Sequence, residues 1–172
     1  MLDDARLVVD VQLPAPDTHV MTPRILLRIA SACLVLLATA CATAGGRWVE
    51  LAGERYIVEV AADDASRARG LMFRDTMPSD HGMLFIHEEE APQAYWMKNT
   101  RIPLDILYFD SGLRLVSQQR DVPPCTAGNR CPPYPSGAPA RFVLELNAGE
   151  AARLQLQDGT QLHVGPGIDV PR

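Results

Sequence analysis

Leu104-Asp-Ile-Leu-Tyr-Phe-Asp-Ser-Gly-Leu-Arg-Leu-Val-Ser-Gln-Gln119 is the stretch that decides the fold class. Residues 104–109 and 113–119 are rich in the aliphatic and aromatic side chains that favour β-strands. Asp110-Ser-Gly112 separates the two runs and has the small, polar composition of a tight turn. The stretch therefore predicts two strands that follow each other closely.

Strands of similar composition are predicted on both sides of this pair. They cover residues 49–51, 56–60, 83–87, 93–98, 141–146 and 161–164. Helix is expected at residues 65–69, between an Asp63 or Asp64 cap and Gly70, and at residues 147–154. Short strands at regular spacing with little helix predict a mainly β chain with minor α, a single compact antiparallel β-barrel or sandwich-like domain.

The longest irregular stretch runs from Asp121 to Pro139 and contains six prolines. Its length favours a functional loop over a plain connection. Cys125 and Cys131, inside it, are expected to form a disulfide that adds about 2 kcal/mol of stability by the chain-entropy estimate. A metal-binding or redox pair is the alternative, although such pairs usually have two residues between the cysteines rather than this longer spacing.

The N-terminal segment predicts export of the protein. Basic side chains near Met21 lead into the apolar run 29–40, which has the length of a signal-peptide core. Ala38-Thr-Ala40 directly before Cys41 resembles a lipobox. Residues 21–40 are therefore predicted to be a lipoprotein signal peptide, and acylated Cys41 is predicted to join the mature chain to membrane lipid. A plain secretory signal is the alternative.

These signals also predict the boundaries of the chain's parts. Residues 1–20 form an acidic leader that does not suit a signal peptide, so Met21 is the expected true start. Residues 41–47 are expected to form a lipidated tether, and residues 48–172 a single globular β-rich domain. Ala42 after the cysteine indicates an extracytoplasmic location on the periplasmic face of the outer membrane.

Charge and side-chain composition argue against two classes of function. The net charge is −5 and the longest run of one sign is Glu88-Glu-Glu90, which disfavours nucleic-acid binding. The side chains that suit a soft metal are Met72, Met83, Met97, His81 and His87. Because the methionines lie in apolar runs, where they ordinarily fill the core, neither a metal nor another cofactor is predicted.

Several short motifs together carry a family resemblance. They are Arg69-Gly-Leu-Met-Phe-Arg74, Gly82-Met-Leu-Phe85, Tyr95-Trp-Met-Lys-Asn-Thr100, Ile102-Pro-Leu-Asp-Ile106 and Phe142-Val-Leu-Glu-Leu146. Residues 55–164, which contain them in order, resemble the domain of unknown function 192 family. The resemblance implies a compact, mainly β domain with minor helix, and it implies no catalytic residues.

A candidate ligand site surrounds the third of these motifs. Trp96 offers an aromatic platform on which a sugar ring or a peptide could stack. Lys98 is the only lysine of the chain, which suggests that this position requires a compact ammonium group rather than a guanidinium group. Asn99 and Thr100 add an amide and a hydroxyl, although a core role for the ring and a surface role for the lysine remain open.

Asp105 is the carboxylate most expected to need a partner, because its strand should be buried on at least one face. The candidate partners are Arg74, Lys98 and Arg101, and they would form either a ligand or acid–base site or a structural ion pair. Asp105 could also pair with Glu145 in a glycosidase, although nothing in the sequence fixes their separation.

The hypothesis from the sequence is a lipid-anchored binding or accessory module for a polar envelope ligand, a saccharide or a peptide. Its ligand-binding residues would be Trp96, Lys98, Asn99, Thr100, Asp105 and Arg74. The alternative is an envelope hydrolase that uses Asp105 as base and Lys98 to stabilise charge. The sequence contains no nucleophile motif, so it leaves open whether the protein is an enzyme.

Overall fold

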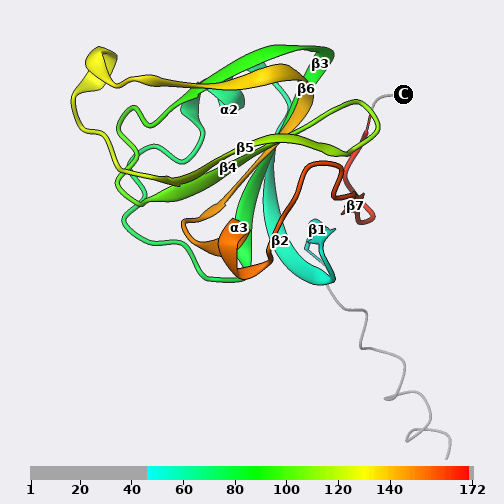
Figure 1. The fold of residues 1–172 in the computed structure, drawn as a ribbon. Helices are drawn as coiled ribbons and strands as arrows, with labels where there is room; N and C mark the ends of the chain where they lie inside the picture. The colour runs from blue at the N-terminus through cyan, green and yellow to red at the C-terminus, as the bar shows by residue number, and fades with distance from the viewer. Residues whose placement is uncertain (1–45, 171–172) are drawn as a thin grey trace, which may run out of the picture. The chain divides into compact units, whose positions relative to one another are not determined.

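The alternating and apolar runs of the sequence form seven strands in the computed structural model, which describes residues 46–170 (Figure 1). The strands are β1 (Trp48–Leu51), β2 (Glu54–Ala61), β3 (His81–Trp96), β4 (Leu104–Phe109), β5 (Leu115–Val122), β6 (Pro133–Asn147) and β7 (Leu162–Val164). Two short helices, α2 (Asp64–Arg69) and α3 (Glu150–Arg153), and a 3-10 turn, η1 (Gly128–Arg130), accompany them. The predicted mainly β class with minor helix is confirmed.

The strands form one sheet in the order β5-β4-β6-β3-β2-β1-β7. All neighbouring pairs are antiparallel except β2 and β3, which run parallel, with Ile57 opposite His81 and Ala61 opposite Phe85. A parallel pair needs a crossover connection, and α2 with the segment after it supplies this crossover. The expectation of an antiparallel domain is therefore correct for all pairs but this one.

The sheet is curled into a half-barrel, and its two outer strands approach each other. The Leu115 N–H donates to the carbonyl of Thr160 over 2.9 Å, and the Leu162 N–H donates to the carbonyl of Leu113 over 2.9 Å. These bonds join the start of β5 to the segment that enters β7. Curling in this way leaves fewer unpaired backbone groups at the edges of the sheet.

Both faces of the sheet centre are buried, because an apolar cluster packs on each face of β4 and β6. Along β4, Leu107 and Phe109 pack into one apolar cluster, whereas Ile106 and Tyr108 pack into a second cluster on the opposite face. Every residue of β4 is buried, whereas the sequence predicted burial of at least one face of this strand. The second cluster lies beneath the candidate site described below.

Helix α2 forms where the sequence predicts it. The Asp63 side chain accepts a hydrogen bond from the Ser66 N–H at 2.9 Å, in a reciprocal capping box, and Gly70 ends the helix at a φ of 46°. Arg67 donates to the backbone carbonyls of Ala62 and Ile86, which lie at 2.7 and 2.8 Å. The helix is thereby held against β3. Helix α3 lies within the second predicted helical segment.

The predicted disulfide between Cys125 and Cys131 is confirmed. The surrounding irregular stretch is shorter than predicted, because β5 continues to Val122 and β6 begins at Pro133. The prolines of β6 lie opposite β3, and the register between these two strands is irregular there. A strand can hold proline at such irregular positions, and for this reason the proline content misled the sequence prediction.

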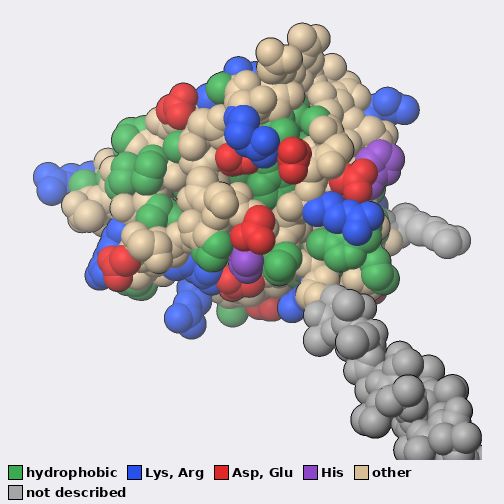
Figure 2. Space-filling model, turned by 90° about the horizontal axis from the view of Figure 1, so that it is seen from below, with side chains coloured by type: hydrophobic (Ala, Val, Ile, Leu, Met, Phe, Trp, Pro, Cys, Tyr) green, Lys and Arg blue, Asp and Glu red, His purple; other side chains and the backbone are tan. Residues whose placement is uncertain are grey.

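Acidic and basic side chains are interspersed on the face of the molecule shown in Figure 2. Within residues 46–170, no helix is long and apolar enough to cross a membrane. The predicted signal peptide, Cys41 and most of the predicted tether lie outside the described residues.

Candidate functional site

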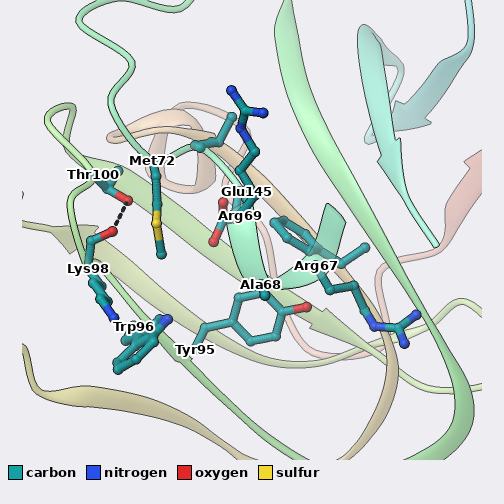
Figure 3. A pocket seen from close by; sticks show the side chains of 12 residues that line it. Arg67, Ala68, Arg69, Met72, Tyr95, Trp96, Lys98, Thr100 and Glu145 are labelled. Carbon is teal, nitrogen blue, oxygen red and sulfur yellow. Dashed lines mark hydrogen bonds between the residues drawn. The ribbon is translucent and has the colours of Figure 1, made fainter. Parts of the chain in front are cut away.

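A narrow crevice opens between the end of helix α2 and the end of strand β3, and β6 forms its floor (Figure 3). Its empty volume is about 280 Å³, counting the part that is open to solvent. The lining residues belong to two stretches of sequence, 67–72 and 95–100, together with Phe85 of β3 and Glu145 near the end of β6. The main polar and aromatic side chains among them are Arg67, Arg69, Tyr95, Trp96, Lys98, Thr100 and Glu145.

Glu145 is the buried carboxyl group at the floor of this crevice. Its side chain is only 4% exposed, yet no hydrogen bond or ion pair reaches it among residues 46–170. Every fully enclosed side-chain oxygen in this part of the chain has a hydrogen-bond partner. Because the Glu145 oxygens have none, they are not fully enclosed, and they border the crevice. Burial raises the pKa of Glu145 to about 8, and no cation counteracts this shift.

The register of the sheet explains why this carboxyl group faces the crevice. Glu145 lies opposite Met83 of β3 and Ile106 of β4, so its side chain shares the face of the second apolar cluster. Tyr95 and Tyr108 lie on the same face, and burial followed by the Glu145 charge raises the pKa of each phenol. Both phenols therefore remain neutral beside Glu145.

Trp96 and Lys98 form the outer wall of the crevice. The Trp96 side chain is 43% exposed, and the Lys98 Nζ lies 4.8 Å from the centre of its ring. Met97, between them, is fully buried and anchors the end of β3. Asn99 then adopts a φ of 55°, a left-handed conformation that asparagine tolerates better than most residues. Alternation along the strand therefore directs Trp96 and Lys98 to the same side.

Backbone hydrogen bonds hold this wall to its neighbours. The Phe73 N–H donates to the carbonyl of Asn99 at 2.8 Å, and the Cys125 N–H donates to the carbonyl of Thr100 at 3.2 Å. The Asn99 amide lies 3.9 Å from the sulfur of Met72. The disulfide loop and the segment after α2 therefore both fix the position of residues 98–100.

Asp105, the carboxylate favoured by the sequence, does not line the crevice. It is fully buried and accepts hydrogen bonds from the backbone N–H groups of Asp121 at 2.8 Å and Ala151 at 2.7 Å. It lies opposite Leu146 in the sheet, whereas Ile106 lies opposite Glu145. Asp105 and Glu145 therefore point to opposite faces of the sheet, and the paired-acid arrangement weighed from the sequence does not form.

The two arginines considered as partners of Asp105 form other ion pairs. Arg74 pairs with Glu59, and Arg101 pairs with Asp75 at 2.8 Å. Of the residues predicted for the site, Trp96, Lys98 and Thr100 line the crevice. Asn99 lies directly beside it, and Arg74 lines an adjoining pocket.

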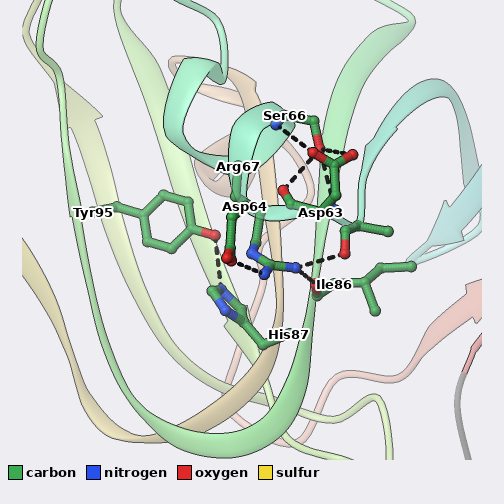
Figure 4. Close-up of polar contacts among 8 residues, drawn as sticks. Asp63, Asp64, Ser66, Arg67, Ile86, His87 and Tyr95 are labelled. Atoms are coloured by element: carbon green, nitrogen blue, oxygen red, sulfur yellow. Dashed lines mark hydrogen bonds and ion pairs between the residues drawn. The ribbon is translucent and has the colours of Figure 1, made fainter.

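Two further pockets adjoin the crevice. One shares Arg69 and Met72 with it and extends to Phe73, whose ring is 57% exposed. The other shares Tyr95 and Trp96 with it and extends to His87. The His87 ring lies 3.0 Å from the Tyr95 hydroxyl, next to Arg67 (Figure 4). Burial, with a smaller effect of Arg67, lowers the pKa of His87.

Glu145 was named from the sequence only as an optional partner of Asp105, and Arg69 and Met72 were not placed at the ligand site. One signal for Glu145 was present, because a carboxylate flanked by Val143, Leu144 and Leu146 in a strand is one that burial should affect. As for metals, residues 46–170 contain no group of three or more histidine, cysteine or acidic side chains placed to hold one ion.

This curled, mainly β domain with a crevice beside α2 has known relatives, and their family profile matches residues 47–164. The chain belongs to the DUF192 family, which is described as uncharacterized ACR, and the resemblance seen in the sequence is confirmed. None of the curated proteins compared matches the chain.

Two solved structures of similar proteins share the fold. One, from Sinorhizobium meliloti 1021, is described as a candidate transcription regulator and is 36% identical, with a TM-score of 0.63 over 69% of this chain and 92% of that chain. The other, a protein of unknown function from Novosphingobium aromaticivorans DSM 12444, is 30% identical, with a TM-score of 0.61 over 71% of this chain and 89% of its own.

Proposed function

We propose that this protein is a lipid-anchored binding module that takes a saccharide in the crevice between α2 and β3. The observation that carries the proposal is the exposed Trp96 ring beside the buried carboxyl group of Glu145, which finds no partner among residues 46–170. An exposed indole can stack against the apolar face of a sugar ring. Lys98, Thr100 and Glu145 supply the few polar groups that would orient its hydroxyls.

A saccharide suits the crevice better than a peptide does. Bound peptides usually add a strand to a sheet edge or lay an apolar face into an apolar groove. Backbone hydrogen bonds join the start of edge strand β5 to the segment that enters edge strand β7, and the crevice is lined by several charged side chains. A transcription-regulating role, suggested by the description of the S. meliloti relative, fits poorly with a net charge of −5.

The hydrolase alternative required Asp105 as a base acting together with Lys98. Both Asp105 oxygens accept backbone hydrogen bonds, and neither faces the crevice that Lys98 lines. A base must be able to reach the proton that it removes. This geometry favours binding over hydrolysis by that pair.

The proposal can be tested by isothermal titration calorimetry with cellotriose, chitotriose and trigalacturonate. At least one of these should bind saturably, and Trp96→Ala should weaken its binding about ten-fold because the stacking platform is lost. Trp48→Phe is the matched control, since Trp48 is the other tryptophan of the chain and lies in β1, outside the residues that line the crevice.

The proposal is wrong if none of the three saccharides binds, or if Trp96→Ala binds as tightly as the Trp48→Phe control. Saturable binding of a tripeptide in the absence of saccharide binding would instead support the peptide alternative.

A further inference from the structure

More of the charged side chains that line the crevice are basic than acidic. Among the described residues that line it, Arg67, Arg69 and Lys98 are basic and Glu145 is the one acidic residue. Arg67 is engaged by Asp64 and by backbone carbonyls, and Figure 3 shows the ends of Arg67 and Arg69 turned away from Glu145. The cations therefore surround the crevice without neutralising its floor.

A carboxyl group buried without a partner is expected to hold its proton. Burial alone shifts the pKa of Glu145, to about 8, so the group is mainly neutral at pH 7. A neutral carboxylic acid carries one O–H donor. Tyr95 and Tyr108, which face it, do not accept a hydrogen bond from it in this structure. No group of residues 46–170 accepts from this donor, so the floor of the crevice offers it to a ligand or to solvent.

We propose that the crevice selects a saccharide that carries a carboxylate, which accepts a hydrogen bond from the Glu145 O–H and lies within the field of Lys98. This inference rests on the proposed saccharide-binding function. An anionic acceptor matches both features of the crevice, the buried donor below and the basic side chains around it. A carboxylate on the sugar ring, as in a uronic acid, or on a substituent of the ring supplies the same chemistry.

An amino sugar matches the crevice less well. Its ammonium group would share the crevice with Lys98 and would need Glu145 in the ionised form, which burial disfavours. A neutral sugar could accept the hydrogen bond from Glu145 but would gain nothing from Lys98. The sign of the charge on the ligand is therefore what separates these cases.

The inference predicts a fall in affinity as the pH rises. Below pH 8, protonated Glu145 donates to the ligand carboxylate, whereas above pH 8 two carboxylates face each other and repel. The affinity for trigalacturonate should therefore fall about ten-fold between pH 6.5 and pH 9, as the protonated fraction of Glu145 falls.

The other titratable groups around Glu145 do not explain a change in this range. The phenols of Tyr95 and Tyr108 have pKa values raised by burial, and the pKa of His87 is lowered by burial. The remaining groups that face the crevice are the basic side chains of Arg67, Arg69 and Lys98 on α2 and after β3.

The test is calorimetric titration of the full chain with trigalacturonate, cellotriose and a glucosamine trimer at pH 6.5 and pH 9. Glu145→Leu, which removes the donor, should weaken trigalacturonate binding about ten-fold at pH 6.5. Glu145→Gln keeps an N–H donor, so it should restore most of this binding and abolish the pH dependence. Glu50→Gln, on β1 outside the crevice, is the matched control and should keep the wild-type pH profile.

Each failure has a separate meaning. If cellotriose binds as tightly as trigalacturonate, or if the trigalacturonate affinity is constant or rises with pH, the carboxylate inference is wrong while saccharide binding stands. If the glucosamine trimer binds most tightly, the site recognises amines and the inference is also wrong. If no saccharide binds at either pH, the proposed function itself fails.

Discussion

At the scale of single residues, two buried carboxyl groups of this domain have opposite surroundings. Asp105 receives hydrogen bonds from two backbone N–H groups, those of Asp121 at the end of β5 and Ala151 in α3. Glu145, which is also buried, receives none among the described residues. Asp105 therefore joins three elements of the fold, whereas Glu145 is free to meet a ligand.

Asp105→Asn should lower the free energy of unfolding by about 1–3 kcal/mol. A side-chain amide has a single acceptor oxygen, so one of the two backbone donors would face the amide N–H and remain unpaired in the core. Urea unfolding followed by circular dichroism measures the change. Asp158→Asn, in the exposed turn before β7, is the control. If Asp105→Asn kept wild-type stability but lost ligand binding, Asp105 would act in the site rather than in the fold.

At this scale the sequence predicted some of the residues that line the crevice. It predicted Trp96, Lys98 and Thr100, because their chemistry is concentrated in one motif and alternation brings every second position to one side. It favoured Asp105 over Glu145, because the donors that satisfy Asp105 are 16 and 46 residues away along the chain. A strand pattern shows that a carboxylate is buried, but not which distant backbone groups reach it.

At the scale of elements, strand positions were easier to predict than strand pairing. The core of each predicted strand lies within or overlaps an observed one, because alternation and β-favouring composition are local properties. The parallel pairing of β2 with β3 was missed, because alternation is the same in a parallel and an antiparallel strand. The length of β6 was missed because its first residues include Pro133, Pro135 and Pro139.

The disulfide loop should contribute to the crevice as well as to stability. Replacing both Cys125 and Cys131 with serine should lower the free energy of unfolding by about 2 kcal/mol, as expected for a closed loop of this length. It should also weaken saccharide binding, because Cys125 holds the backbone of Thr100 and pairs with Lys98. Thermal unfolding and calorimetric titration measure the two effects.

Wild-type protein treated with a thiol reductant should behave like the double-serine variant, which controls for the substitutions themselves. Equal stability of the oxidised and the double-serine proteins would show that the loop is held by its other contacts. Unchanged saccharide binding would show that residues 98–100 keep their position without it.

At the scale of the whole molecule, the proposed anchor restricts where the crevice can work. Strand β1 begins at Trp48, so residues 41–47 would separate an acylated Cys41 from the folded sheet. Even fully extended, a segment of this length spans at most about 25 Å. A ligand of the anchored domain would therefore have to lie close to the membrane surface, as saccharides of the envelope do.

The anchor itself can be tested in a Gram-negative host. Cys41→Ser should move the protein from the membrane fraction to the soluble periplasmic fraction, because the residue that would carry lipid is lost and no helix within residues 46–170 could hold the protein in the membrane. Cys33→Ser, inside the predicted signal, should leave the protein in the membrane fraction. Mass spectrometry of the mature wild-type protein should find an acylated N-terminal peptide that begins at Cys41.

Membrane association that survives Cys41→Ser, or a mature chain that retains residues 1–20, would show that the export signal was misread. The argument for an envelope ligand would then lose its basis.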